Sequence, residues 1–294
     1  MTPVLTTKSA NFCFNMACKD DLGRELYMVS GKAELSLYKD KGVGGKHDFE
    51  QLRHVYEGAK SIADFRVMKN KNLIVCQNYT EIAILEPTTS GAYKVLGKIE
   101  AKDYESAQMK KGTLTKKEDF YFVFSFNALY KIKLDGNKLT NVASYVAKPA
   151  QVYDFQLLED RKEVILNRLE SSYSYIKILG FDDLQVIRSV TGSITMLFRT
   201  WYNESAQQLI GKEINGPVMK VFQFDQNLEK VQSAFDVEAC EYRQGCGQLY
   251  HVPEYNLLFY GGLNQLKAMT TEGHTFIANF ECKGCPKAMT HVPA

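Results

Sequence analysis

Short apolar runs separated by polar turns organise this chain, and they are clearest between Lys60 and Glu100. Runs rich in Ile, Val, Leu, Tyr or Phe occur at Ile62–Met68, Asn72–Gln77, Glu81–Leu85 and Tyr93–Ile99. Each run has the length of a strand and ends at turn residues such as Asn, Thr, Pro or Gly. The pattern predicts four antiparallel strands in about forty residues. Because one small sheet would expose apolar residues on both faces, it should stack on further copies of itself.

Further copies of the four-run unit are found along the whole sequence. Asp154-Phe155 stands about 90 positions after Asp64-Phe65, which corresponds to two periods of about 45 residues. The predicted units span residues 11–57, 60–100, 104–146, 151–190, 193–236 and 247–281. The pattern therefore predicts an all-β chain of four-stranded antiparallel sheets, arranged as the blades of a β-propeller that forms one domain over residues 1–294.

The end of the sequence repeats the start of a unit once more. His291-Val-Pro copies His251-Val-Pro of the sixth unit, so the segment from residue 287 is expected to be the first strand of a seventh blade. Two arrangements would satisfy this pattern: six blades could close the ring with the tail lying on the first, or the chain could be part of a longer polypeptide. The close copy favours the longer polypeptide.

The repeated units resemble degenerate WD40-type β-propellers. The resemblance lies in the short four-strand units, the hydrophobic third strands and a polar turn at residues 19–23 between the first two runs. The family's Gly-His and Trp-Asp dipeptides are absent, since the single tryptophan, Trp201, is followed by Tyr202. The resemblance implies a rigid disc that serves as a scaffold for other proteins within a larger assembly.

Composition narrows the range of partners and compartments. The chain carries 36 basic and 34 acidic residues, for a formal charge of +2, so no strong field would attract nucleic acid or an anionic membrane. No apolar run reaches the length of a membrane span, and the first residues lack a signal-peptide pattern. Seven cysteines without dense spacing are typical of reduced thiols. We therefore expect a cytoplasmic protein without a membrane span; whether it belongs to a cytoskeletal or ciliary complex is not determined by the sequence.

Four cysteines suggest a metal site. Cys240 and Cys246 fall in the loop after the fifth unit, and Cys282 and Cys285 fall in the equivalent loop after the sixth. The Cys-x-x-Cys pair has zinc-knuckle spacing, and four thiolates on adjacent loops would suit a closed structural Zn²⁺ site. Free thiols, a chance echo of the repeat or a disulfide are the alternatives, and no other cofactor is expected.

A lysine-rich segment suggests an acidic partner. Lys110, Lys111, Lys116 and Lys117 lie in residues 110–118, which we expect to form a loop between the first and second strands of the third unit. Loops on a rigid scaffold are common binding sites. The plainer interpretation is a solvated loop.

No catalytic motif is present. The nucleophile elbow, the His-Glu-x-x-His zinc motif and the EF-hand loop do not occur, and Lys41–Lys46 has the wrong spacing for a phosphate-binding loop. Asp64 and Asp154 lie on expected inner strands, where their plainer role is structural, bonding backbone groups in a loop. The leading hypothesis is a non-catalytic interaction scaffold. The alternative is a propeller enzyme of the metal-dependent hydrolase type, with inward Asp and His at the channel mouth.

Aromatic residues on the strands are expected to form the core. Phe65 and Phe155 should be buried at equivalent places in their units. The run Phe120–Phe126 places a phenylalanine at every second position, so its four rings should share one buried face.

Overall fold

The structure is a computed structural model, and it describes part of the chain. The residues whose backbone it describes are 13–19, 25–30, 35–40, 49–54, 62–68, 70–71, 73–78, 80–87, 93–100, 109–171, 173–192, 194, 197–213, 219–237, 249–252, 255–262 and 265–281. Side chains are described for most of these positions from Asp64 onward.

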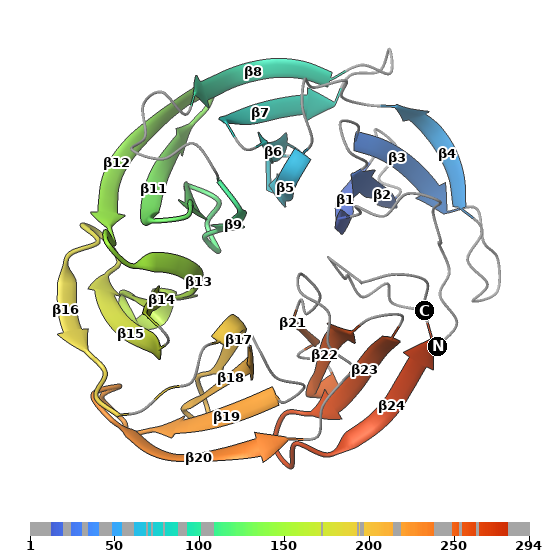
Figure 1. Cartoon of the computed structure of the whole chain (residues 1–294). Helices are drawn as coiled ribbons and strands as arrows, with labels where there is room; N and C mark the ends of the chain where they lie inside the picture. The colour runs from blue at the N-terminus through green and yellow to red at the C-terminus, as the bar shows by residue number, and fades with distance from the viewer. Residues whose placement is uncertain are drawn as a thin grey trace. The chain divides into compact units, whose positions relative to one another are not determined.

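Within these residues, 24 strands form six four-stranded sheets (Figure 1). In each sheet the strands pair in chain order, and neighbouring strands run antiparallel, as β13 to β16 do. The first three sheets comprise β1 (Cys13–Lys19), β2 (Glu25–Ser30), β3 (Leu35–Asp40) and β4 (Phe49–His54); β5 (Ile62–Met68), β6 (Leu73–Asn78), β7 (Glu81–Pro87) and β8 (Tyr93–Glu100); and β9 (Lys111–Leu114), β10 (Phe120–Phe124), β11 (Ala128–Asp135) and β12 (Lys138–Val146). The last three comprise β13 (Gln151–Leu158), β14 (Glu163–Glu170), β15 (Tyr173–Gly180) and β16 (Val186–Ser189); β17 (Leu197–Asn203), β18 (Gln208–Glu213), β19 (Met219–Phe224) and β20 (Val231–Val237); and β21 (Leu249–Val252), β22 (Leu257–Gly262), β23 (Gln265–Thr270) and β24 (Phe276–Glu281).

Contacts group the chain into two compact units. The first unit comprises residues 1–125, 131–142 and 288–294, and the second comprises residues 126–130 and 143–287. The first two sheets, β9 and β10 therefore belong to the first unit. The fourth, fifth and sixth sheets belong to the second unit.

The repeated four-run pattern correctly predicted this series of sheets. In the first, second, fourth, fifth and sixth sheets, the predicted unit overlaps all four observed strands. Helix among the described residues is limited to single 3₁₀ turns such as Glu159–Arg161, as the pattern predicted. The segment from residue 287, where a seventh blade was expected to begin, lies outside the described residues.

The third sheet departs from the prediction at its first strand. The third unit was predicted to begin at residue 104, with its first strand ahead of the lysine-rich loop at residue 110. The observed first strand, β9, is Lys111–Leu114, and residues 101–108 are outside the described part. β9 pairs with β10 from Lys111 opposite Phe124 to Leu114 opposite Tyr121. The four residues of β9 have little apolar alternation, so periodicity alone pointed to the wrong segment.

The phenylalanine run was predicted correctly in part. β10 ends at Phe124, and the side chains of Phe122 and Phe124 are buried. Phe126 was expected on the same buried face, but it lies beyond the strand and is 40% exposed. The backbone has left β10 there, because the Phe126 carbonyl accepts a hydrogen bond from the Val152 N–H at 2.8 Å.

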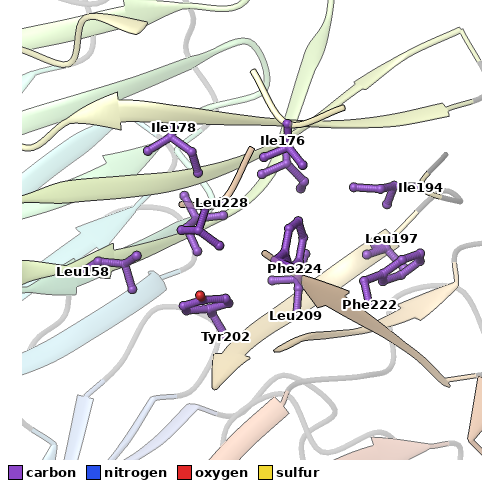
Figure 2. Close-up of a cluster of buried hydrophobic side chains, with 12 residues drawn as sticks. Leu158, Ile176, Ile178, Ile194, Leu197, Tyr202, Leu209, Phe222, Phe224 and Leu228 are labelled. Carbon is purple, nitrogen blue, oxygen red and sulfur yellow. The ribbon is translucent and has the colours of Figure 1, made fainter. Parts of the chain in front are cut away.

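The core of the second unit shows how neighbouring sheets pack. Apolar side chains of β13, β14 and β15 meet those of β17, β18 and β19 in one cluster, in which Ile178, Leu209 and Phe222 are almost fully buried (Figure 2). Burying such a side chain stabilises the fold by about 1.5–3 kcal/mol. Phe65 and Phe155, on β5 and β13, are 0% and 2% exposed, which confirms the expected burial of both rings.

Candidate interaction surface

The structure separates the four lysines that the sequence grouped together. Lys110 and Lys111 lie at the start of β9, whereas Lys116 and Lys117 lie in the turn between β9 and β10. The expected single loop is therefore wrong, because Lys111–Leu114 pairs with β10 as a strand. A four-residue strand spans roughly 10 Å or more, so the two lysine pairs present charge at opposite ends of β9.

The turn that carries Lys116 and Lys117 is tightly bonded. The Thr115 N–H donates to the Phe120 carbonyl at 3.0 Å, and the Glu118 N–H donates to the Thr115 carbonyl at 2.9 Å. The Thr115 hydroxyl donates to the Asp119 carboxylate at 2.7 Å. Glu118 has a φ of 57°, in the left-handed region that such turns use. These bonds hold Lys116 and Lys117 at the exposed end of the β-hairpin.

Glu118 joins this turn to the β5–β6 turn of the neighbouring sheet. Its carboxylate accepts a hydrogen bond from the Asn70 N–H at 3.0 Å, and its backbone carbonyl accepts one from the Lys71 ammonium at 3.1 Å. Glu118 is itself buried, with 7% of its surface exposed. A charge-assisted bond in a buried position is stronger than its solvent-exposed equivalent, so the two turns form one ordered surface.

We call this surface the lysine turns, defined by Lys71, Lys116 and Lys117. All three residues are exposed. The acids nearest in sequence are already engaged, Glu118 with Asn70 and Asp119 with Thr115. Glu118 and Asp119 keep their charge, because the groups that they bond are neutral. Three lysines beside these two acids leave the lysine turns with a small excess of positive charge on a fixed backbone.

Lys71 was missed by the sequence analysis. It lies 47 residues from Glu118, and no local pattern connects the two. The repeat could have placed Lys71 near Lys116 and Lys117. All three lie in turns that follow the first strand of a unit, and such turns of successive units lie at the same end of neighbouring sheets.

A buried network lies below the lysine turns. The Tyr121 hydroxyl donates to the Gln77 side-chain carbonyl at 2.5 Å, and both residues are fully buried. The Tyr121 ring passes so close to Gly112 that a Cβ there would lie 1.9 Å from the phenol oxygen. A glycine at this position lets β9 lie against Tyr121, which fixes the hairpin that carries Lys116 and Lys117.

The two inner-strand aspartates bond backbone groups, as expected. The Asp64 carboxylate accepts hydrogen bonds from the N–H groups of Phe65 at 2.9 Å and of Gly112, in the next sheet, at 3.0 Å. Asp154 repeats the arrangement with Phe155 at 3.0 Å and Thr200 at 2.9 Å. The expectation that these backbone groups belong to a loop is wrong, because Asp64 and Asp154 lie in β5 and β13 and the N–H groups of Gly112 and Thr200 lie in β9 and β17. Carboxylates held in this way link adjacent sheets.

The other expected sites are described only in part. Cys240, Cys246, Cys282 and Cys285 lie outside the described residues, so the zinc site stays a prediction. Elsewhere, in the part of the chain that the structure describes, no three His, Cys, Asp or Glu side chains are grouped so as to hold a metal ion. Within the same part, none of the helices is both long and apolar enough to cross a membrane.

Comparison with known proteins identifies the fold. No protein-family model and no curated protein sequence matches the chain. Among solved structures, Sqt1 from Chaetomium thermophilum is similar with a TM-score of 0.64 and 12% identity, over 88% of this chain and 70% of Sqt1. Sqt1 from Saccharomyces cerevisiae is similar with a TM-score of 0.64 and 10% identity, over 95% of this chain and 77% of Sqt1.

The chain therefore has an all-β propeller fold, and each of its four-stranded sheets corresponds to a blade. This confirms the fold predicted from the repeat. At 10–12% identity the similarity describes the fold, and function has to be argued from the site.

Proposed function

We propose that this protein is a non-catalytic scaffold for protein–protein interaction, and that the lysine turns bind an acidic segment of a partner protein. The observation that carries the proposal is the pair of adjacent turns, joined through buried Glu118, that hold three exposed lysines. On this proposal the protein works in the cytoplasm as a subunit of a larger assembly.

The order of the surface supports a binding role. Flexible lysines that become fixed on binding lose side-chain entropy, which offsets much of an exposed ion pair. Here the backbone under Lys116 and Lys117 is already fixed by Thr115, and Lys71 is held against Glu118. A positive surface on a rigid scaffold also raises the rate of association with a negative partner, more strongly at low salt.

The state of the inner-strand carboxylates favours a scaffold over the hydrolase alternative. Such an enzyme would use inward acids at the channel mouth to hold its metal. In Asp64 and Asp154, both carboxylate oxygens already accept bonds from backbone N–H groups. Their geometry supports a structural role between blades.

A binding experiment with a defined acidic probe tests the proposal. A fluorescein-labelled peptide of ten glutamates would be titrated with the full-length protein, and anisotropy recorded at 50 and 200 mM NaCl. We expect the triple variant K71E/K116E/K117E to weaken binding by about tenfold or more at the lower salt. The matched control is K94E/K110E/K138E, which changes the charge by the same amount at three other exposed lysines.

The controls separate the alternatives. Equal losses in both triple variants would show that only net charge matters and would refute the lysine turns as a site. A loss confined to the control variant, which includes Lys110, would favour the other end of β9. Tighter binding of a single-stranded oligonucleotide than of the peptide would favour nucleic acid over protein and would also refute the proposal.

A further inference from the structure

A second surface lies on the β14–β15 hairpin of the second unit. Tyr173 and Tyr175 are 57% and 44% exposed, and they lie two residues apart on one face of β15. Single exposed aromatic residues are common on protein surfaces, but neighbouring tyrosines are a typical feature of binding sites. Their partners across the strand pair are Glu170 and Arg168, respectively. We call these four residues the tyrosine hairpin.

The charged pair beside the tyrosines is held in one arrangement. The Arg168 guanidinium donates to the Glu170 carboxylate at 2.6 Å and to the Tyr145 hydroxyl at 2.9 Å. Arg168 is thereby fixed between β12 and β14, and its side chain is only 15% exposed. The Glu170 side chain is 44% exposed. Arg168 bonds one oxygen of this carboxylate, Oε2, so a second cation would share Glu170 with Arg168, beside the two exposed tyrosine rings.

This combination is complementary to a cation. The faces of tyrosine rings attract guanidinium and ammonium groups, and a neighbouring carboxylate adds an ion pair. The nearest cation along β15 is Lys177, which bonds Ser189 and lies about 13 Å from Tyr173 along the strand. At the hairpin tip, the Tyr173 ring and Glu170 thus form a site that suits an incoming positive side chain.

We propose that the tyrosine hairpin docks a basic protein segment, with an arginine side chain lying against Tyr173 and Tyr175 and paired with Glu170. Arginine suits the site better than lysine, because its planar guanidinium can stack on a ring while donating to a carboxylate. This surface is separate from the lysine turns, and it selects a partner of the opposite charge. The proposal therefore does not depend on the function proposed for the lysine turns.

The test uses a matched pair of peptides and the full-length protein. A labelled peptide with three arginines spaced by glycine and serine would be compared by anisotropy with the same peptide carrying citrulline, which has the same shape without the charge. We expect the arginine peptide to bind about tenfold more tightly or better. Tyr173→Ala and Tyr175→Ala should each weaken its binding about two- to fivefold, and Glu170→Gln should weaken it by a similar factor.

Controls make each outcome informative. Tyr255→Ala removes a tyrosine that is 56% exposed at a different place, and it should leave binding unchanged. Equal binding of the two peptides, no saturable binding of either, or an equal loss in Tyr255→Ala would overturn the proposal. Analytical sedimentation tests whether a second copy of this chain occupies the hairpin instead. If the protein self-associates and the double variant Y173A/Y175A abolishes the self-association, the hairpin binds a second copy and the proposal is wrong. Failure of the glutamate-peptide experiment would leave this one intact.

Discussion

The Asp154 bridge between the fourth and fifth blades makes the sharpest prediction about stability. Its carboxylate accepts hydrogen bonds from the Phe155 N–H at 3.0 Å, the Thr200 N–H at 2.9 Å and the Thr200 hydroxyl at 3.4 Å. Asp154 is completely buried. Water therefore cannot replace the carboxylate when it is removed, and both backbone donors would lose their partner.

The expected magnitudes follow from these contacts. Each buried donor left without a partner costs about 1–3 kcal/mol, so Asp154→Ala, which leaves two, should destabilise the protein by about 2–6 kcal/mol. Asp154→Asn keeps one acceptor oxygen but turns an NH₂ group towards a backbone donor, and it should cost about 2–3 kcal/mol. Thr200→Val removes only the long hydroxyl contact and keeps the shape of the side chain, so it should cost less than about 1 kcal/mol.

Urea denaturation of the full-length protein, followed by circular dichroism at 25 °C, measures all three variants under one set of conditions. A carboxylate that accepts bonds from two backbone donors predicts a definite order for the loss in free energy of unfolding. The loss should be largest for Asp154→Ala, smaller for Asp154→Asn and smallest for Thr200→Val. If Asp154→Asn unfolds within about 0.5 kcal/mol of the unmodified protein, the second bond is not contributing and the reasoning fails.

Three further predictions concern the core and its titration. Phe155→Ala should cost about 3–5 kcal/mol in the same assay, because the ring is buried and its loss leaves a cavity; a cost below about 1 kcal/mol would contradict this. Gly112→Ala should lower the melting temperature strongly, since its Cβ would lie 1.9 Å from the Tyr121 oxygen, whereas Gly273→Ala, whose nearest neighbour would be 3.4 Å away, serves as the control. Burial raises the pKa of Tyr202 to about 12; the nearby Arg161 charge lowers this pKa, and nearby acids raise it. The folded state therefore holds the phenol proton more tightly than the unfolded chain does. The contribution of Tyr202 to the free energy of unfolding is therefore fully present below about pH 10. It is lost between about pH 10 and 12, by at most about 2.7 kcal/mol. Tyr202→Phe should remove this part of the alkaline loss when unfolding is measured as a function of pH.

The blades were predicted well from the sequence because each blade is formed by one continuous segment of the chain. Its four strands are consecutive in the chain, so apolar runs and turn residues carry most of the information. The prediction failed where a strand lacked that pattern: β9 contains Gly112, whose role depends on the Tyr121 ring packed against it. A requirement imposed by a neighbouring side chain leaves no periodic signal in the strand itself.

The candidate surfaces were harder to predict, because they join residues from different hairpins. Lys116 and Lys117 were found as a charge run, but their link to Lys71 passes through Glu118, whose burial is a tertiary property. Tyr175 begins an apolar run typical of a strand and Tyr173 lies just before that run, and nothing in the pattern marks either ring as exposed. Their exposure follows from what packs beside β15, and that is decided by neighbouring strands rather than by β15 itself.

The Asp64 and Asp154 bridges join neighbouring blades through the backbone of the receiving strand. Each bridge needs an aspartate in one blade but only a backbone N–H in the next, and that N–H comes from Gly112 in one case and Thr200 in the other. A bond to the backbone does not by itself specify the side chain of the receiving residue, although at Gly112 the Tyr121 ring separately requires a glycine. Neighbouring blades can thus stay joined without a matching side chain in the receiving blade. The same freedom leaves the turns above the bridges open to change, and both proposed surfaces lie at the ends of such hairpins.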